Sequence, residues 1–394
     1  MKEGWTYKKL GEVCEILNGF AFQSKNYVPE GIRVVRITNV QKGYIEDIDP
    51  KYYPIESKNE LSRYLLKDGD LLLSLTGNVG RVAIIDYSYL PAYLNQRVAC
   101  IRVKENVSLD LNFLFHLLYS KKFEGDCIKS SKGAAQLNMS TIWLASYLIP
   151  VPSIEEQLSI VAYLDAAFAH IDALKANAEK QLTEARQLFQ AELTKCMRQK
   201  EGWEEKALGE VCIKSKNIKW DNVDEGKTFT YIDLTSVDRT DLQIHNPQII
   251  NKHNAPSRAK QIIHSGDIIF ATTRPTLRRV SLIDEQYDGD ICSTGFCVLR
   301  PDNNVVSEWI FYALQEEHFY SYIEPLQAGA NYPAVTDGDV KNYAIPIPSK
   351  DTQHSIVSRL DALSANIKKL EEVQRKTLAE CDALKQAMLR EVFE

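Results

Sequence analysis

The feature that most constrains this chain is a stretch that it contains twice. Residues 149–174 begin with Ile-Pro-Val-Pro-Ser, and residues 345–370 begin with Ile-Pro-Ile-Pro-Ser. The second copy follows the first at a constant offset of 196, as Pro346 against Pro150 shows (346 − 150). Self-similarity of this length predicts an internally duplicated fold, in which one chain builds two equivalent units.

Each copy predicts the start of a long helix. Ser153 and Ser349 follow the rigid Pro-x-Pro segments and are suitable N-caps. Glu156 has the spacing of a capping box in the first copy, whereas Thr352 takes that place in the second. After the caps, no proline or glycine occurs until Gly202 in the first copy, and none occurs in the rest of the second. Nothing in either sequence therefore ends the helix early.

Apolar residues recur along both helices at steps of three and four, the spacing of one helix face. They include Ile160, Leu164 and Ile171 in the first helix. A helix of about forty-five residues spans roughly 65 Å, which is too long for a compact core. The pattern predicts two rods that pair as an antiparallel coiled coil and bring the two ends of the chain together near Trp5. The alternative is two unrelated surface helices on separate domains, which the length and the repeat both disfavour.

Two globular segments alternate with the two rods. The predicted domains are residues 1–152 and 201–349, and the predicted helical segments are residues 153–200 and 350–394. Both globular segments contain short apolar runs that end at glycine and aspartate turns, which indicates strands. The sequence therefore predicts an α+β fold, with two mixed α/β domains separated by an antiparallel coiled coil in a pseudo-twofold arrangement.

Composition limits the kinds of partner. The chain has 394 residues, 44% hydrophobic and 25% charged, with a formal net charge of −6. An acidic chain is unsuited to coating nucleic acid nonspecifically, because such binding depends on neutralising phosphates. No apolar run reaches membrane-spanning length, and the first residues lack the apolar core of a signal peptide. We expect a cytoplasmic protein with no membrane contact.

Signatures of metal sites and catalysis are missing. The eight cysteines form no Cys-x-x-Cys pair, and Cys292, Cys297 and His264 are the group most worth checking for zinc. The segment beginning at Gly226 resembles the end of a phosphate-binding loop, but Asp221 stands where its leading glycine would be, so a polar turn is the better interpretation. We expect neither a metal site nor catalytic residues on this chain.

The loops differ between the two copies although the framework repeats. Residues 76–81 and 94–97 of the first segment have different counterparts at 273–279 and 292–295 in the second. Variable loops on a repeated scaffold indicate that each domain recognises something different. Their side chains suit DNA, because arginine pairs with guanine, asparagine and glutamine pair with adenine, and lysine neutralises phosphate.

For any single residue the alternative is a solvated loop charge or a turn residue. The residues that we predict to contact DNA are Arg36, Thr38, Asn78, Arg81, Asn95, Gln96, Arg97, Lys132, Lys216, Lys219, Arg274, Thr276, Arg278, Arg279, Ser293 and Thr294.

The arrangement resembles the specificity subunit of type I restriction-modification systems. The resemblance rests on Trp5 and Leu10-Gly11-Glu12 at the repeat start, on Gly-Asp before an apolar strand, and on Ile-Pro-x-Pro-Ser followed by Glu155-Glu156-Gln157. It covers nearly the whole chain, and the duplicated layout is more specific than any single motif.

The resemblance implies two target-recognition domains, each reading half of a split site in double-stranded DNA. It implies rods that set the spacer between the half-sites and dock two modification (methyltransferase) subunits, with Glu155, Glu156, Gln157 and Gln353 as docking residues. Asp351 and Thr352 depart from the first copy there. Restriction subunits that translocate DNA would join the assembly, and S-adenosylmethionine, ATP and magnesium would bind the partner subunits rather than this non-catalytic chain.

Two other functions remain open from the sequence. One is a self-contained restriction enzyme or methyltransferase, against which the missing catalytic motifs count. The other is a coiled-coil adaptor that does not touch DNA.

Overall fold

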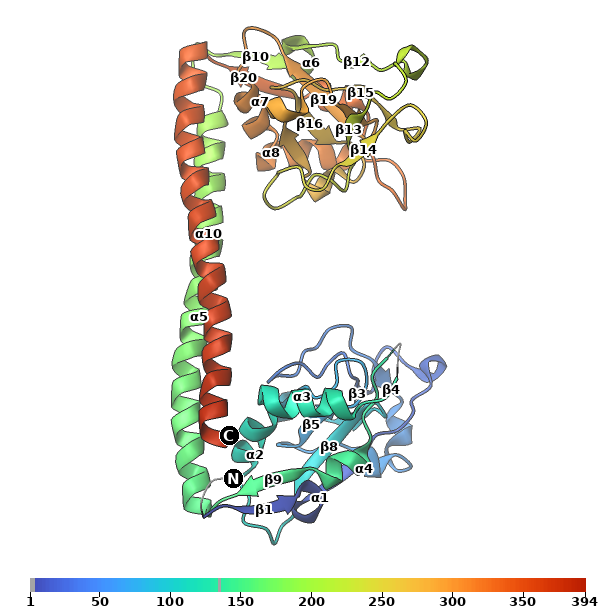
Figure 1. The fold of residues 1–394 in the computed structure, drawn as a ribbon, viewed down its shortest axis with the longest axis vertical. Helices are drawn as coiled ribbons and strands as arrows, with labels where there is room; N and C mark the ends of the chain where they lie inside the picture. Colours follow the sequence, from blue (N-terminus) through green and yellow to red (C-terminus); the bar gives the residue numbers. More distant parts are fainter. Residues whose placement is uncertain (1–3, 134–135) are drawn as a thin grey trace. The chain divides into compact units, whose positions relative to one another are not determined.

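The structure is a computed structural model that describes residues 4–133 and 136–394. The chain forms two compact units, of which unit 1 contains residues 1–178 and 375–394 and unit 2 contains residues 179–374. Each unit combines a globular part of short strands and helices with part of each of two 44-residue helices, α5 (Ile154–Met197) and α10 (Lys350–Phe393) (Figure 1). The predicted α+β class is confirmed.

The globular part of unit 1 contains nine strands and four helices among its described residues. The strands are β1 (Thr6–Lys9), β2 (Cys14–Asn18), β3 (Ile32–Val35), β4 (Tyr52–Tyr53), β5 (Leu71–Ser74), β6 (Val82–Ile84), β7 (Ala92–Leu94), β8 (Val98–Val103) and β9 (Leu148–Val151). The helices are α1 (Leu10–Val13), α2 (Leu111–Leu118), α3 (Lys121–Ser130) and α4 (Thr141–Ser146).

The globular part of unit 2 repeats this plan with two additional strands. Its strands are β10 (Glu204–Ala207), β11 (Cys212–Ile213), β12 (Lys216–Asn217), β13 (Phe229–Ile232), β14 (Gln248–Ile250), β15 (Ala259–Ile262), β16 (Ile268–Ala271), β17 (Val280–Leu282), β18 (Ile291–Ser293), β19 (Phe296–Pro301) and β20 (Ala344–Ile347). Its helices are α6 (Leu208–Val211), α7 (Ser307–Ala313), α8 (Glu317–Ile323) and α9 (Asp337–Lys341).

A four-stranded antiparallel sheet lies at the centre of each globular part. Its strand order is β2-β8-β5-β6 in unit 1 and β11-β19-β16-β17 in unit 2. Successive side chains of a strand point to opposite faces. In β5, Leu71 and Leu73 therefore face the core that contains α2 and α3, while Leu72 faces a second core with Val35 and Leu94 of the smaller sheet β4-β3-β7. Each central sheet is buried on both sides.

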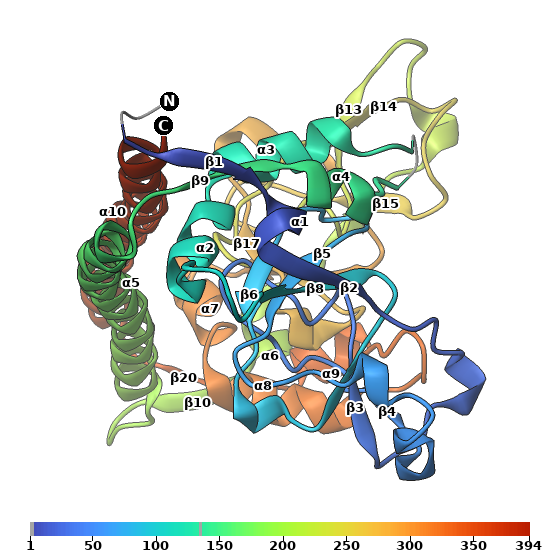
Figure 2. The same cartoon turned by 90° about the horizontal axis from the view of Figure 1, so that it is seen from below.

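The first and last strands of each globular part pair with each other. Strand β1 pairs antiparallel with β9, and β10 pairs in the same way with β20. Both views show β1 beside β9, next to the start of α5 (Figures 1 and 2). Because β9 and β20 each lead directly into a long helix, this pairing fixes the point at which the helix leaves its globular part.

The start of each long helix has the predicted cap. Ser153 Oγ accepts a hydrogen bond from the backbone N–H of Glu156, and Ser349 Oγ accepts one from that of Thr352. The Glu156 carboxylate accepts a hydrogen bond from the indole N–H of Trp5 at 2.8 Å. In the second copy the hydroxyls of Ser349 and Thr352 bond to each other.

The two long helices run antiparallel where they pair within each unit. In unit 1, Lys385 forms an ion pair with Asp172, and Lys175 forms one with Asp382. In unit 2, Arg186 pairs with Glu371, and Arg359 pairs with Glu192. Partner numbers rise along one helix as they fall along the other, so the predicted antiparallel pairing is confirmed in both units. Both views show α5 and α10 side by side (Figures 1 and 2).

The helix pair shares the hydrophobic core of each unit. In unit 1, Leu164 and Ile171 of α5 and Leu389 of α10 belong to the same buried cluster as α2 and the central sheet. Trp5 and Phe393 both pack against the ring of Phe113, with ring centroids 6.5 and 5.4 Å away. The predicted proximity of the two ends of the chain is therefore confirmed within unit 1.

The predicted domain boundaries remain a prediction. Helices α5 and α10 occupy most of the segments expected at 153–200 and 350–394, but each helix contributes residues to both units. Across the part of the chain that the structure describes, none of the helices combines the length and apolar character needed to cross a bilayer.

One pair of equivalent positions predicts a difference in pH response between the units. In unit 1, buried His116 bonds through Nε2 to a carboxylate oxygen of Asp165 at 2.7 Å, and its Nδ1 has no hydrogen-bond partner. In unit 2, Tyr312 takes this position and donates its hydroxyl to Asp361 at 2.6 Å. Burial lowers the pKa of His116, and the hydrogen bond with Asp165 opposes that shift only in part.

A lowered pKa means that the folded state favours neutral His116. Its contribution to stability is therefore present above the pKa of an unfolded histidine, roughly 6.5, and is lost as pH falls below that value. We predict that His116→Tyr, which copies unit 2, makes the free energy of unfolding less dependent on pH between 7 and 5. Urea unfolding at several pH values measures this. His354→Tyr, at an exposed histidine of α10, is the matched control, and an equal change in both variants would contradict the assignment.

Candidate nucleic-acid interface

Three loops meet at one edge of the central sheet in unit 1. We define loop cluster 1 as residues 75–80, 95–97, 132–133 and 136–139. The N–H of Leu75 donates to the carbonyl of Arg97, and the N–H of Gly77 donates to the carbonyl of Leu137. Lys132 and Asn138 exchange backbone hydrogen bonds across the third loop. The structure thus brings together the predicted residues Asn78, Gln96, Arg97 and Lys132.

Unit 2 repeats the arrangement with different residues. We define loop cluster 2 as residues 272–278, 293–295 and 328–335. The N–H of Thr272 donates to the carbonyl of Gly295, and the N–H of Arg274 donates to the carbonyl of Pro333. Ala328 and Ala334 exchange backbone hydrogen bonds, as Lys132 and Asn138 do in unit 1. The same backbone framework therefore carries both clusters.

Most of the predicted contact residues have exposed side chains. Those residues are Thr38, Asn78, Gln96, Arg97, Lys132, Lys216, Lys219, Arg274, Thr276 and Thr294. Within residues 4–133 and 136–394, the Arg97 guanidinium has no hydrogen-bond or ion-pair partner. A guanidinium in that state keeps its donors available for a base or a phosphate.

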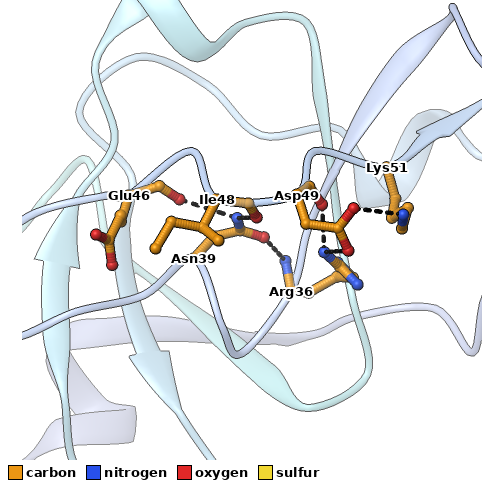
Figure 3. A network of polar contacts seen from close by, with 6 residues as sticks. All are labelled: Arg36, Asn39, Glu46, Ile48, Asp49 and Lys51. Atoms are coloured by element: carbon orange, nitrogen blue, oxygen red, sulfur yellow. Dashed lines mark hydrogen bonds and ion pairs between the residues drawn. The ribbon is translucent and has the colours of Figure 1, made fainter. Parts of the chain in front are cut away.

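Arg36 is held inside its own loop rather than presented freely. Its guanidinium donates to the backbone carbonyl of Asp49, whose carboxylate lies 3.5 Å from the same nitrogen (Figure 3). Lys51 donates to the other Asp49 oxygen at 2.6 Å and lowers the pKa of that carboxyl. Asn39 accepts from the backbone N–H of Arg36 and donates to the carbonyl of Glu46. These bonds stabilise the loop, so a contact between Arg36 and DNA stays a prediction.

Three other predicted arginines have partners within their own unit. Arg81 donates to the side-chain oxygen of Gln41 at 2.6 Å, and Arg279 donates to the carbonyl of Leu234. Arg278 donates through both terminal nitrogens to the Glu317 carboxylate, at 2.5 and 2.6 Å. A bidentate pair of this kind is among the stronger polar contacts in proteins. Arg278 would have to leave Glu317 before it could read a base.

Two predicted contact residues have buried side chains, so a DNA contact through these side chains stays a prediction. Asn95 is 6% exposed, and its side-chain oxygen accepts from the N–H of Arg97. Ser293 is 3% exposed, and its hydroxyl accepts from the N–H of Gly295. Each shapes the turn that presents the next exposed residues of its loop. They therefore act on the site through the backbone, by fixing the loop.

Lys216 and Lys219 lie outside loop cluster 2. Lys216 belongs to β12, the edge strand of the sheet β12-β15-β18-β13-β14, and pairs with Ile262. Lys219 caps the short 3₁₀ turn Trp220–Asn222 that follows. Both side chains are exposed. Lysine side chains mainly neutralise phosphate, so both suit phosphate contact better than base contact.

The predicted docking residues fall into two groups. Glu155 and Glu156 are exposed at the start of α5. Gln157 and Gln353 are 0% exposed, and docking through these two side chains stays a prediction. The Gln157 amide accepts from the N–H of Asp110 and donates to the carbonyls of Ser108 and Pro152. Gln353 makes the equivalent three bonds in unit 2.

The cysteine and histidine group singled out in the sequence is not assembled as a metal site. Cys292 and Cys297 are fully buried in β18 and β19, and burial raises the pKa of both thiols. His264 bonds to Asp288 at an exposed turn. Among the described residues, no three metal-binding side chains are grouped together.

A cleft of about 580 Å³ lies within unit 2, between the helix pair, α7, α8 and the loop 239–243. Its walls carry charges of both signs, and two of its arginines are already paired, Arg186 with Glu371 and Arg278 with Glu317. Such a mixed surface attracts phosphates weakly. The exposed loop clusters are therefore the better candidates for the nucleic-acid contact.

The third loop of each cluster was missed in the sequence, apart from Lys132. Its signal was available at the same offset of 196: Gly133 and Gly329 match, and Gln136 stands where Tyr332 stands in unit 2. Both glycines have positive φ, +120° and +101°, as expected at a tight turn. Gln136 is exposed and Tyr332 is 70% exposed. Each third loop thus places an exposed side chain that differs between the units, Gln136 or Tyr332, in its cluster.

The chain contains two copies of one α+β unit, each with a repeated framework and a different set of polar loop residues, as expected of a duplicated recognition protein. Family comparison agrees with this class: the model for the type I restriction modification DNA specificity domain matches residues 2–184 and again residues 200–380. The chain belongs to this family.

Similar proteins share the whole length of the chain. It is 22% identical over 420 residues to the type I restriction enzyme EcoBI specificity subunit of Escherichia coli, covering 99% of this chain and 86% of that protein. It is 24% identical to the StySPI specificity subunit of Salmonella potsdam, covering 100% of this chain and 89% of that one.

Solved structures show the same fold. A chain from a structure of a type I restriction-modification system, determined for its assembly and conformational transition, has a TM-score of 0.74 and 23% identity, covering 100% of this chain and 98% of that chain. The HsdS subunit from Thermoanaerobacter tengcongensis has a TM-score of 0.53 and 22% identity, covering 99% and 97%.

The free and the paired arginines predict different effects on DNA binding. Arg97→Ala should weaken binding by about 1 kcal/mol or more and reduce its salt dependence, because the Arg97 guanidinium has no partner among the described residues. Arg278→Ala should have a smaller effect, since Glu317 already holds that guanidinium. Fluorescence anisotropy with labelled duplex at two salt concentrations, on the chain assembled with its partner subunits, measures both. A larger loss from Arg278→Ala would contradict this ranking.

Proposed function

We propose that this chain is the non-catalytic DNA-recognition subunit of a type I restriction-modification complex and that each unit reads one half of a split DNA site. The observation that carries the proposal is the pair of loop clusters. Their backbone hydrogen bonds match, from Gly77 to Leu137 in unit 1 and from Arg274 to Pro333 in unit 2. Their exposed side chains differ, as required of two readers with different targets.

The chemistry of the clusters fits bases and phosphates. Exposed amide and guanidinium groups, such as those of Gln96 and Arg97, can bond to base edges in the major groove. Lysines such as Lys132 supply phosphate contacts that carry no sequence information. A chain with net charge −6 gains little nonspecific affinity from its total charge. Binding must therefore depend on local basic loops and on partner subunits.

The partners proposed are two modification subunits, one for each unit, and restriction subunits that translocate DNA. Of the predicted docking residues, Glu155 and Glu156 are exposed at the start of α5. Unit 2 has Asp351 and Thr352 at the equivalent positions, so its docking surface carries less negative charge. S-adenosylmethionine, ATP and magnesium belong to those partners in this proposal.

The long helices are proposed to set the distance between the half-sites. Each contains 44 residues, and a continuous α-helix rises about 1.5 Å per residue. Neither contains proline or glycine, the residues that most often kink a helix. A stiff helix pair converts a number of residues into a length, which on DNA corresponds to a number of base pairs.

Mapping methylated adenines in the host genome, with and without this gene, tests the proposed function. The expected result is one motif with two specific parts and a spacer of constant length, lost when the gene is deleted. A continuous motif, or a motif that survives deletion, would contradict the proposal. Methylation or cleavage by the purified chain alone would favour a self-contained enzyme instead.

A further inference from the structure

One pair of positions differs in an informative way between the two loop clusters. Gly77 in unit 1 and Arg274 in unit 2 occupy the same place, because both donate their backbone N–H to the third loop, to Leu137 at 2.8 Å and to Pro333 at 2.7 Å. Both have left-handed backbone conformations, with φ of +69° and +51°. The framework therefore demands a positive φ at this position in both units.

Glycine meets that demand without strain, whereas arginine does not. Unit 1 has the glycine, and unit 2 has Arg274 in the same conformation with an exposed side chain. Strained residues of this kind persist where the surrounding structure holds them and are concentrated at functional sites. The Arg274 side chain is therefore a candidate for a role that glycine cannot perform.

The neighbour of this position changes together with it. In unit 2 the Arg274 guanidinium lies 4.9 Å from the centre of the Tyr332 ring and donates to the carbonyl of Asn331 at 3.2 Å. In unit 1 the equivalent neighbour is Gln136, whose amide nitrogen lies 3.6 Å from the place where a Cβ on Gly77 would stand. Each cluster thus pairs position 77 or 274 with position 136 or 332.

The Tyr332 ring constrains the guanidinium that it touches. A cation over an aromatic face is attracted to the ring, and an arginine fork that is oriented in advance loses less freedom when it binds. The hydrogen bond to Asn331 uses one terminal nitrogen, and the exposed remainder of the group has further donors. An oriented, exposed guanidinium fits the two acceptors O6 and N7 of guanine in the major groove.

We propose that Arg274, oriented by Tyr332, reads a guanine in the half-site of unit 2, and that Gln136, which lies beside Gly77, reads an adenine in the half-site of unit 1. This deepens the proposed function and rests on it. Glutamine is the matching choice for adenine, because its amide offers one donor and one acceptor to N6 and N7. Arg274 and Gln136 are the specificity-determining residues, and Tyr332 is a positioning residue.

The test uses the full chain assembled with its modification subunits and a library of DNA duplexes with randomised half-sites. Arg274→Ala should reduce the preference for guanine at one position of one half-site by about tenfold or more and leave the other half-site unchanged. Arg274→Lys should keep affinity but lose most of that preference, since lysine lacks the planar fork. Gln136→Ala should relax one adenine position in the other half-site.

Variants of Tyr332 separate positioning from folding. Tyr332→Ala should relax the same guanine position as Arg274→Ala, while Tyr332→Phe keeps the ring and should restore the preference. The matched control is Arg63→Ala, because Arg63 is another exposed arginine over a tyrosine ring, 4.6 Å from that of Tyr64 in unit 1. It should leave the half-site of unit 2 unchanged.

Unchanged base preferences in Arg274→Ala and Tyr332→Ala proteins that melt at the wild-type temperature would overturn the inference. Because the wild-type complex is measured in the same library, the proposed function is tested separately. If the wild type selects a two-part motif and the variants select the same one, only this inference fails. If the wild type selects no two-part motif, the proposed function fails with it.

Discussion

Each long helix is joined to its globular part by one buried glutamine in its first turn. Gln157 and Gln353 each accept one backbone hydrogen bond and donate two, within a site that excludes water. An amide in that position is costly to remove, because its partners would be left buried without hydrogen bonds. The join fixes the direction in which the helix leaves the globular part and therefore the position of the reading loops relative to it. The duplicated fold depends on this join being made twice.

Within each unit, buried polar residues hold the loops in shape, and exposed residues on the same loops are the candidates for recognition. Buried groups such as Asn95 and Ser293 use their side chains on the backbone and hold the loops in shape. Exposed side chains on those loops, such as those of Gln96 and Thr294, do not hold the loops in shape. Substitutions at such surface positions usually change the free energy of unfolding very little. In the proposed function, loop substitution would change the DNA target while the helices and the framework stay the same. The two units of this chain already share a framework and differ in their loop residues.

The sequence was sufficient to predict the elements that follow from a repeated pattern of apolar residues. The long helices followed from apolar periodicity without proline or glycine, and their antiparallel pairing followed from the repeat and their length. The sequence was not sufficient to predict which single polar residues are buried. From its position in the polar first turn of a helix, Gln157 was expected on the surface. It is buried because its amide bonds to the backbone of Ser108 and Asp110, which are far away in sequence. Tyr332 was missed for a similar reason, because its role emerges only when its loop lies against Arg274.

The central claim is that paired helices of fixed length hold two independent readers to one divided DNA site. Insertion of one heptad into both α5 and α10, in register, tests it most directly, because it lengthens the pair without changing either loop cluster. Sequencing of the methylated sites produced by the assembled variant should show the same two half-sites with a longer spacer. An unchanged spacer, or altered half-sites with the old spacing, would contradict the account.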